Sequence, residues 1–303
     1  MSKNLKLIGS ITYDEITYAS GELITGLGGV LYQAAVLCGL EEEVFLHAHL
    51  SEELADKVEK TVEKWTTLHK EGILAVSGPG NEVHLHYPKE GERIETLKSV
   101  VDPLDPGPIL EELDQMAMLI LVINSGLDIQ LPDWQRIVRT ASCPIWVDIH
   151  SLFLTKWLGV PRKYSYLPEW KDWVEGISYL QANVKEVAAM LGHPQTLPSE
   201  AELIEFGETV FDLRVKAVFL TLGKEGVLIL KPGESLKVAA DKAERVVDTT
   251  GCGDVFCGGT VVKLASGEDA FEAARFGVEL ATKAAGVKGI AETFKLASEY
   301  KRL

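Results

Sequence analysis

The run Asp248-Thr249-Thr250-Gly251-Cys252-Gly253-Asp254 combines residue types that suit the transfer of an anionic group. Gly251 and Gly253 have no Cβ atom, so backbone amides here can approach an anion closely. Apolar residues then recur at helical spacing until Gly267, which predicts that the run opens onto the N-terminus of a helix. The free amides and the dipole at such an end together favour a bound anion.

Asp254 is the unusual member of this run. A carboxylate beside an anion site repels phosphate, unless it serves as a base. A base next to an anion hole is what phosphoryl transfer to a hydroxyl group requires. The structural alternative is an Asp-capped helix after a glycine turn, which would be preferred for Gly-x-Gly-Asp alone. The longer run, and the motifs described below, favour the catalytic interpretation.

Length and composition restrict the class of protein. A chain of 303 residues, 46% hydrophobic and 25% charged, can form one large α/β domain. The net charge of −15 argues against a nucleic-acid or anionic-membrane surface, although a local anion site with magnesium can still hold a nucleotide. The four cysteines lack metal-ligand spacing, and no apolar run is long enough for a signal peptide or a membrane span. We therefore expect a reducing, cytoplasmic setting.

Strand patterns alternate with helix patterns through most of the chain. This order predicts a doubly wound, mostly parallel α/β sheet flanked by helices, in a single domain over 1–303. A charged amphipathic helix is expected over 52–70. Hairpin patterns near 12–26 and 81–98 predict a small β lid. The predicted buried strands are 5–11, 43–48, 118–123, 144–150, 177–182 and 218–222.

Several other classes of site lack their motifs in this sequence. There is no Gly-x-x-x-x-Gly-Lys-Ser/Thr loop, no Gly-x-Gly-x-x-Gly after the first strand, and no nucleophile elbow. His84 and His86 share one face of a predicted strand, but no third ligand is nearby, so a metal site there is disfavoured.

The run from Asp248 to Asp254 resembles the C-terminal signature of the ribokinase-like (phosphofructokinase B type) carbohydrate kinases, a family that includes nucleoside kinases. Cys252 stands where that family more often has alanine. Four further motifs match the family in the same order: Gly9-Ser10-Ile11-x-x-Asp14, Gly28-Gly29, Asn183-x-x-Glu186 and Thr221-x-Gly223-x-x-Gly226.

The resemblance implies an ATP-dependent kinase that phosphorylates a hydroxymethyl group of a sugar or related polyol. Asp254 would be the general base, and the amides of Gly251, Cys252 and Gly253 the anion hole. The acceptor side would comprise Asp14, Gly28, Gly29 and Asp148. The nucleotide side would comprise Asn183, Glu186, Thr221, Gly223, Gly226 and Gly289. Glu186 would hold magnesium, directly or through water, and Asp248 and Thr250 a monovalent cation such as K⁺.

Three of these residues also have an interpretation that does not depend on the resemblance. Asp14 follows the predicted first strand, and open α/β sheets bind ligands beyond the carboxyl ends of their strands. Asn183-x-x-Glu186 has the spacing of a helix capping box, and this structural role is compatible with a place near the phosphates.

The identity of the acceptor stays open, because Val30, Gln33 and His150 depart from the family pattern on the acceptor side. A nucleoside kinase is the nearest alternative. From another class, a ligand-binding protein of the same fold without turnover is possible, but the intact Asp254 and glycine loop argue against it. The expected partners are a small sugar, polyol or nucleoside and, through the exposed edge of the lid, a second copy of the chain.

Overall fold

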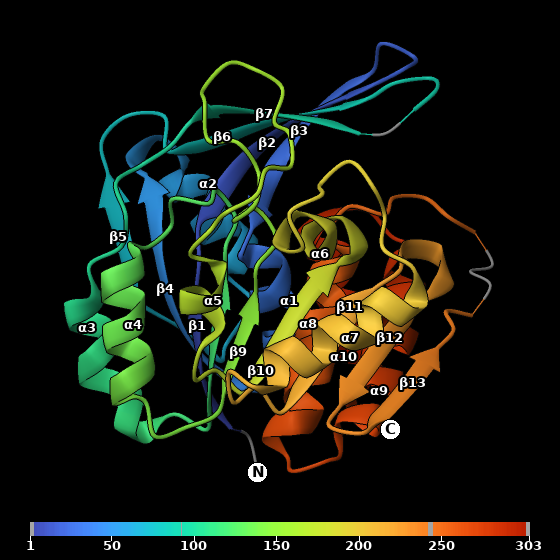
Figure 1. Ribbon diagram of the computed structural model, residues 1–303. Helices are drawn as coiled ribbons and strands as arrows, with labels where there is room; N and C mark the ends of the chain where they lie inside the picture. Colours follow the sequence, from blue (N-terminus) through green and yellow to red (C-terminus); the bar gives the residue numbers. More distant parts are fainter. Residues whose placement is uncertain (1–2, 92, 242–244, 301–303) are drawn as a thin grey trace.

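The computed structural model describes residues 3–91, 93–241 and 245–300 (Figure 1). Its larger sheet has nine strands in the order β13-β12-β11-β10-β9-β8-β1-β4-β5. All neighbours from β11 to β5 are parallel, whereas β12 and β13 are antiparallel to theirs. The strands are β1 Asn4–Ile8, β4 Glu43–Ser51, β5 Leu68–Val76, β8 Met118–Val122, β9 Ile145–Asp148, β10 Tyr179–Asn183, β11 Ala217–Thr221, β12 Val227–Lys231 and β13 Glu234–Val238.

Helices cover both faces of this sheet, which explains the continuous apolar run of β8. Met118 and Ile120 belong to the core on one face, whereas Leu119 and Leu121 belong to the core on the other. The first core includes residues of α1 Leu31–Gly39, α2 Ala55–Val62, α8 Cys252–Ala265, α9 Ala270–Ala284 and α10 Gly289–Tyr300. The second includes residues of α3 Pro106–Glu112, α4 Leu131–Thr140, α5 Trp170–Val174, α6 Val184–Met190 and α7 Glu200–Phe211. The predicted doubly wound, mostly parallel fold is confirmed.

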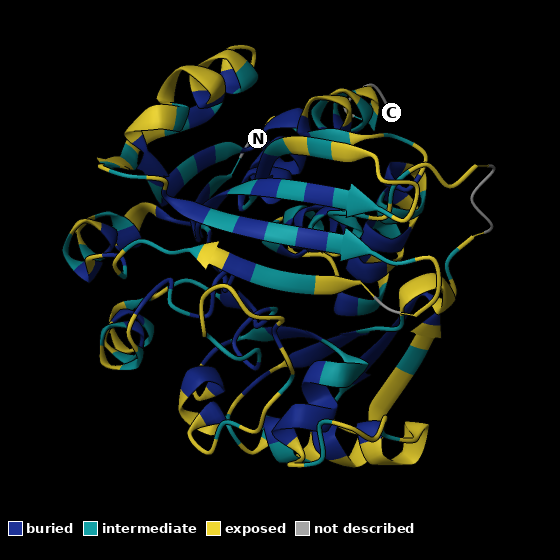
Figure 2. Ribbon diagram, turned by 90° about the horizontal axis from the view of Figure 1, so that it is seen from above, coloured by how far each residue is buried: buried dark blue, intermediate teal, exposed yellow. Residues whose placement is uncertain are grey.

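The smaller sheet has four strands in the order β3-β2-β6-β7 and is the predicted lid. It comprises β2 Ile11–Tyr18, β3 Leu23–Gly29, β6 Asn81–Tyr87 and β7 Ile94–Ser99. Figure 1 shows it above the carboxyl ends of the parallel strands, and Figure 2 shows the alternation of buried and less buried residues along it. Asp14 and Ile16 are buried, whereas Glu15 and Thr17, which alternate with them along β2, are only partly buried.

The predicted helix over 52–70 is wrong in its second half. A 3₁₀ turn, η1 Glu52–Leu54, precedes α2, which ends at Val62, and β5 begins at Leu68. The Thr67 carbonyl accepts a hydrogen bond from the Val44 amide at 2.9 Å, and the Trp65 ring stacks on Phe294 with centroids 5.5 Å apart. Long-range strand pairing and burial of the Trp65 ring therefore override the local helical pattern.

The order of the strands reverses direction between β1 and β8, because the chain leaves β1 toward β4 on one side and adds β8 on the other. Such a reversal leaves a crevice at the carboxyl edge of a sheet, where ligands bind. Here the Ser10 amide donates to Asn124 Oδ1 at 3.1 Å.

Among the described residues, no helix is long and apolar enough to cross a membrane.

Candidate active site

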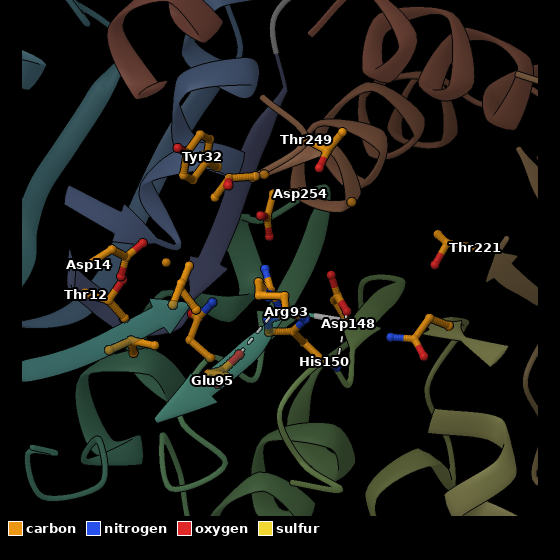
Figure 3. Close-up of a pocket in the computed structure, with 18 of the residues that line it drawn as sticks. Thr12, Asp14, Tyr32, Arg93, Glu95, Asp148, His150, Thr221, Thr249 and Asp254 are labelled. Atoms are coloured by element: carbon orange, nitrogen blue, oxygen red, sulfur yellow. Dashed lines mark hydrogen bonds and ion pairs between the residues drawn. The ribbon is translucent and has the colours of Figure 1, made fainter. Parts of the chain in front are cut away.

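A cavity of about 220 Å³ lies between the lid and the carboxyl edge of the large sheet (Figure 3). Residues from β2, α1, the β6–β7 hairpin, the ends of β8 to β11 and the loop before α8 line it. Ten of the residues predicted for the site are among them: Asp14, Gly29, Asp148, Asn183, Glu186, Thr221, Thr250, Gly251, Gly253 and Asp254.

Six predicted residues lie outside the lining: Gly28, Gly223, Gly226, Asp248, Cys252 and Gly289. Gly226 has a structural reason, because a Cβ there would lie 2.0 Å from the Val238 carbonyl oxygen of β13. Gly289 begins α10 at a φ of +75°. Asp248 accepts a hydrogen bond from the Thr250 amide at 2.9 Å and so stabilises the turn of the loop before α8.

Asp254 lies in the first turn of α8 and points into the cavity (Figure 3). Gln33 Nε2 donates a hydrogen bond to Asp254 Oδ1 at 2.5 Å. Burial raises the pKa of the Asp254 carboxyl to about 7, although the bond from Gln33 acts in the opposite direction. A carboxyl group that titrates near neutrality is well matched to accepting a proton.

The loop before α8 exposes part of its backbone. The Cys252 amide donates to the Thr249 carbonyl at 3.3 Å, so this member of the predicted anion hole is engaged within the loop. The amides of Gly251 and Gly253 have no backbone acceptor among the described residues. Because a helix leaves its first amides unpaired, these two can meet an anion at the edge of the cavity.

Gly251 has two reasons to be glycine. Its φ is +81°, and a Cβ would lie 2.6 Å from the ring of Tyr32. We expect Gly251→Ala to lose turnover and more than the roughly 1–2 kcal/mol of stability that the left-handed backbone alone costs. Gly267→Ala is the matched control, since Gly267 has a φ of +90° and nothing within 4 Å. Urea denaturation and turnover measured for both variants check this prediction. It would be contradicted if Gly251→Ala were destabilised no more than Gly267→Ala and kept full turnover.

At the other end of the cavity, Asp14 is 8% exposed and accepts a hydrogen bond from Thr12 Oγ1 at 2.7 Å. Burial raises the pKa of its carboxyl to about 6. A Cβ at Gly28 would lie 2.0 Å from Asp14 Oδ2, so Gly28 supports the acceptor side without lining it. Gly29, at a φ of +61°, turns the chain from β3 toward α1.

Asp148 ends β9 and is 4% exposed. Gln181 Nε2 donates to Asp148 Oδ2 at 2.9 Å and to the Gly253 carbonyl at 3.2 Å. One amide thus joins an acceptor-side carboxyl group to the loop of Asp254. Burial, and the nearby charge of Asp254, raise the pKa of Asp148 well above its usual range. His150 lines the same wall, and its φ of +21° places it in a conformation unusual for a residue other than glycine.

Asn183 and Glu186 form the predicted capping box at the start of α6. Glu186 Oε2 accepts from the Asn183 amide at 2.7 Å, and Oε1 accepts from Asn183 Nδ2 at 2.5 Å. Burial raises the pKa of Glu186 well above its usual range. No group of three or more metal-ligating side chains converges anywhere in the described part of the chain. With Glu186 as the single carboxyl group offered, the site suits a magnesium ion that is held mainly by phosphate oxygens and water, and does not suit an ion surrounded by protein ligands.

Two charged residues of the site, Arg93 and Glu95, carry no sequence motif and were missed. Arg93, just before β7, reaches into the cavity, with Nη2 3.5 Å from Glu95 Oε2 (Figure 3). Glu95 Oε1 is 2.7 Å from Nη1 of Arg162, which also donates to backbone carbonyls of the acceptor-side wall. The alternation along the hairpin could have indicated that Glu95 faces inward, opposite Leu85.

The lid is also tied to the loop of Asp254. Tyr87 Oη lies 3.1 Å from Thr250 Oγ1, and the Tyr87 ring stacks on Tyr18 with centroids 5.5 Å apart. These contacts join the far end of β2 and β6 to the loop before α8, so the lid contacts this loop directly.

Comparisons with known proteins find similar sequences and similar folds. The family model described as pfkB family carbohydrate kinase matches residues 157–295. The bifunctional protein HldE of Pectobacterium atrosepticum is 29% identical over 190 residues, which cover 61% of this chain and 35% of HldE. The chain therefore spans about a third of the length of this curated relative.

Solved structures show the same fold. Arabidopsis thaliana ribokinase complexed with ribose and ATP has a TM-score of 0.77 at 19% identity, covering 100% of both chains. Adenosine kinase from Sinorhizobium meliloti has a TM-score of 0.77 at 16% identity, covering 100% of this chain and 99% of that one. The resemblance to the ribokinase-like carbohydrate kinases is confirmed by the family match and by the shared fold.

Proposed function

We propose that this ribokinase-like chain transfers the terminal phosphoryl group of ATP to a hydroxymethyl group of a sugar or related polyol, with Asp254 as general base. The observation that carries the proposal is the position of Asp254, in the cavity and in the first turn of α8 beside open backbone amides. This position supports a proton acceptor and an anion site within one helical turn of each other.

The reaction then follows from the residues in the cavity. Asp14 accepts hydrogen bonds from acceptor hydroxyl groups and orients the reacting one toward Asp254. Asp254 takes the proton of that hydroxyl group as its oxygen bonds to phosphorus, and the bond from phosphorus to the ADP oxygen breaks. The amides of Gly251 and Gly253 stabilise the charge on the transferring group. The products are a phosphate ester, ADP and a proton on Asp254, which returns to solvent.

The nucleotide side is assigned to Thr221, Asn183 and Glu186, which line the cavity beyond the ends of β10 and β11. Glu186, directly or through water, would hold magnesium, which neutralises phosphate charge when it is bound. The monovalent cation predicted at Asp248 and Thr250 stays a prediction. Comparison of turnover in K⁺ and in tetramethylammonium salts tests it.

Phosphate transfer from ATP across a panel of sugars, polyols and nucleosides tests the proposed function. Turnover with one class of acceptor supports the kinase and names the class. Turnover with nucleosides alone would favour the second candidate, which is supported by the adenosine kinase among the similar structures. Measurable ligand binding with no turnover on any acceptor would favour a binding protein. Cytoplasmic location and a homodimer through the lid remain predictions.

The pH dependence of the rate follows from the two aspartates. Asp254 must be ionised to accept a proton, and its pKa is raised to about 7, so kcat/KM should fall as pH drops through 7. Asp14, with a pKa raised to about 6, should steepen the fall below that pH. Acceptor kcat/KM measured from pH 5 to 9 at saturating nucleotide checks this. A rate unchanged from pH 5 to 8 would remove Asp254 as the base.

A further inference from the structure

We propose that Gln33 is a positioning residue that holds Asp254 by one oxygen and favours the ionised form of its carboxyl group; this rests on the proposed role of Asp254 as base. Gln33 is fully buried in α1 and does not line the cavity. The bond from its Nε2 atom to Asp254 Oδ1 joins residues 221 positions apart. No described side chain other than Gln33 donates a hydrogen bond to this carboxyl group, and Oδ2 is the oxygen left to take the proton.

The packing of α1 on α8 explains why Gln33 reaches Asp254. A Cβ at Gly258 would lie 2.7 Å from Val36 Cγ1, so the absence of a side chain lets the two helices approach closely. Gln33 lies about one turn before Val36 in α1, and Asp254 lies one turn before Gly258 in α8. The close contact of Val36 with Gly258 thus brings the Gln33 amide and the Asp254 carboxyl group together, because each lies one turn before that contact in its own helix.

The orientation of the Gln33 side-chain amide affects the charge state of the Asp254 carboxyl group. An N–H donor stabilises a carboxylate more than the neutral acid, so the bond from Gln33 opposes the effect of burial on Asp254. Gln33 Oε1 is buried without a partner. A buried amide oxygen left unpaired is costly, and the structure retains it where the same amide serves the proposed base.

The other charged and titratable groups near Asp254 come from several elements. They are Asp14 on β2, Arg93 before β7, Asp148 on β9, Tyr32 on α1, Asp248 and Cys252 around the start of α8, and Cys257 within α8. Among these, Arg93 and Gln33 favour the charged carboxylate, and Asp14 disfavours it. Arg93 belongs to the lid, whereas Gln33 belongs to the core. The bond from Gln33, like the bond from the backbone amide of Asp254 itself, is therefore independent of the position of the lid.

The test replaces the donor and reads the ionisation of Asp254 directly. In Gln33→Leu, the carboxyl carbon of Asp254, followed by ¹³C NMR and assigned by its absence in Asp254→Asn, should titrate at a pH higher by on the order of one unit. The acidic limb of kcat/KM should shift upward by the same amount. The rate at pH 6 should then fall about tenfold and recover near pH 9.

Val36→Ala is the matched control, because it loosens the packing of α1 on α8 and removes no hydrogen bond. This variant should leave the pH at which Asp254 titrates unchanged. Gln33→Asn, which keeps the amide one methylene shorter, provides a second variant if Gln33→Leu does not fold, and it should shift the titration in the same direction. An unchanged titration in a folded Gln33 variant, or an equal shift in Val36→Ala, would overturn the proposal. The NMR titration needs no turnover, so absence of phosphate transfer in the unaltered protein would refute the proposed function alone.

Discussion

Asp254→Asn is expected to lower kcat by roughly 10²–10⁴-fold, the usual contribution of a positioned base. Asparagine keeps the size of the side chain and its place in the first turn of α8, but it cannot accept the proton of the acceptor. The nucleotide contacts assigned to Thr221 and Asn183 lie elsewhere in the cavity, so affinity for ATP should stay within a few-fold. Steady-state rates and calorimetric titration with ADP measure the two effects separately.

Asp269→Asn is the matched control for the loss of a carboxylate at a helix N-terminus. Asp269 caps α9 through the Phe271 amide at 2.9 Å and does not line the cavity. Its replacement should change stability slightly and leave kcat alone. If Asp254→Asn turned over at nearly the unaltered rate, another residue would have to be the base.

Asp14→Ala is expected to raise the KM for the acceptor by about 10- to 100-fold, which corresponds to the loss of roughly 1.5–3 kcal/mol from hydrogen bonds to a charged group. The KM for ATP should change little, because Asp14 lies at the end of the cavity opposite Thr221 (Figure 3). Initial rates with each substrate varied in turn separate the two constants.

Glu15→Ala serves as the control for Asp14→Ala. Glu15 is the next residue of β2, so its side chain points to the other face of the lid, away from the cavity. Both variants remove one carboxylate from the same strand, but only Asp14→Ala should affect the acceptor. An unchanged KM for the acceptor in Asp14→Ala would take Asp14 out of the acceptor site.

The sequence predicted the parts of the site that depend on local geometry. The capping box of Asn183 and Glu186 and the helix that begins after Gly251 are set by residues within a few positions of one another. The doubly wound sheet was also predictable, because strands buried on both faces read as continuous apolar runs. These features need no information from distant parts of the chain.

Tertiary structure decided the remaining parts. The turn at Trp65 and the start of β5 at Leu68 depend on pairing with β4, which outweighs a helical pattern. Arg93 and Glu95 enter the cavity only because the lid folds over the edge of the large sheet. The hairpin pattern indicates which face of a strand a residue is on, but not which residues of the large sheet that face meets.

The run from Asp248 to Asp254 shows both contributions in one place. Its sequence by itself determined a glycine turn and a carboxylate at the start of a helix, because backbone freedom and capping act over a few residues. Only the fold decided that Gln33 meets Asp254, that Gln181 bridges Asp148 to Gly253, and that burial moves the pKa of Asp254 to about 7. These properties arise from contacts between residues that are far apart in the chain and from exclusion of water, which a local pattern cannot encode.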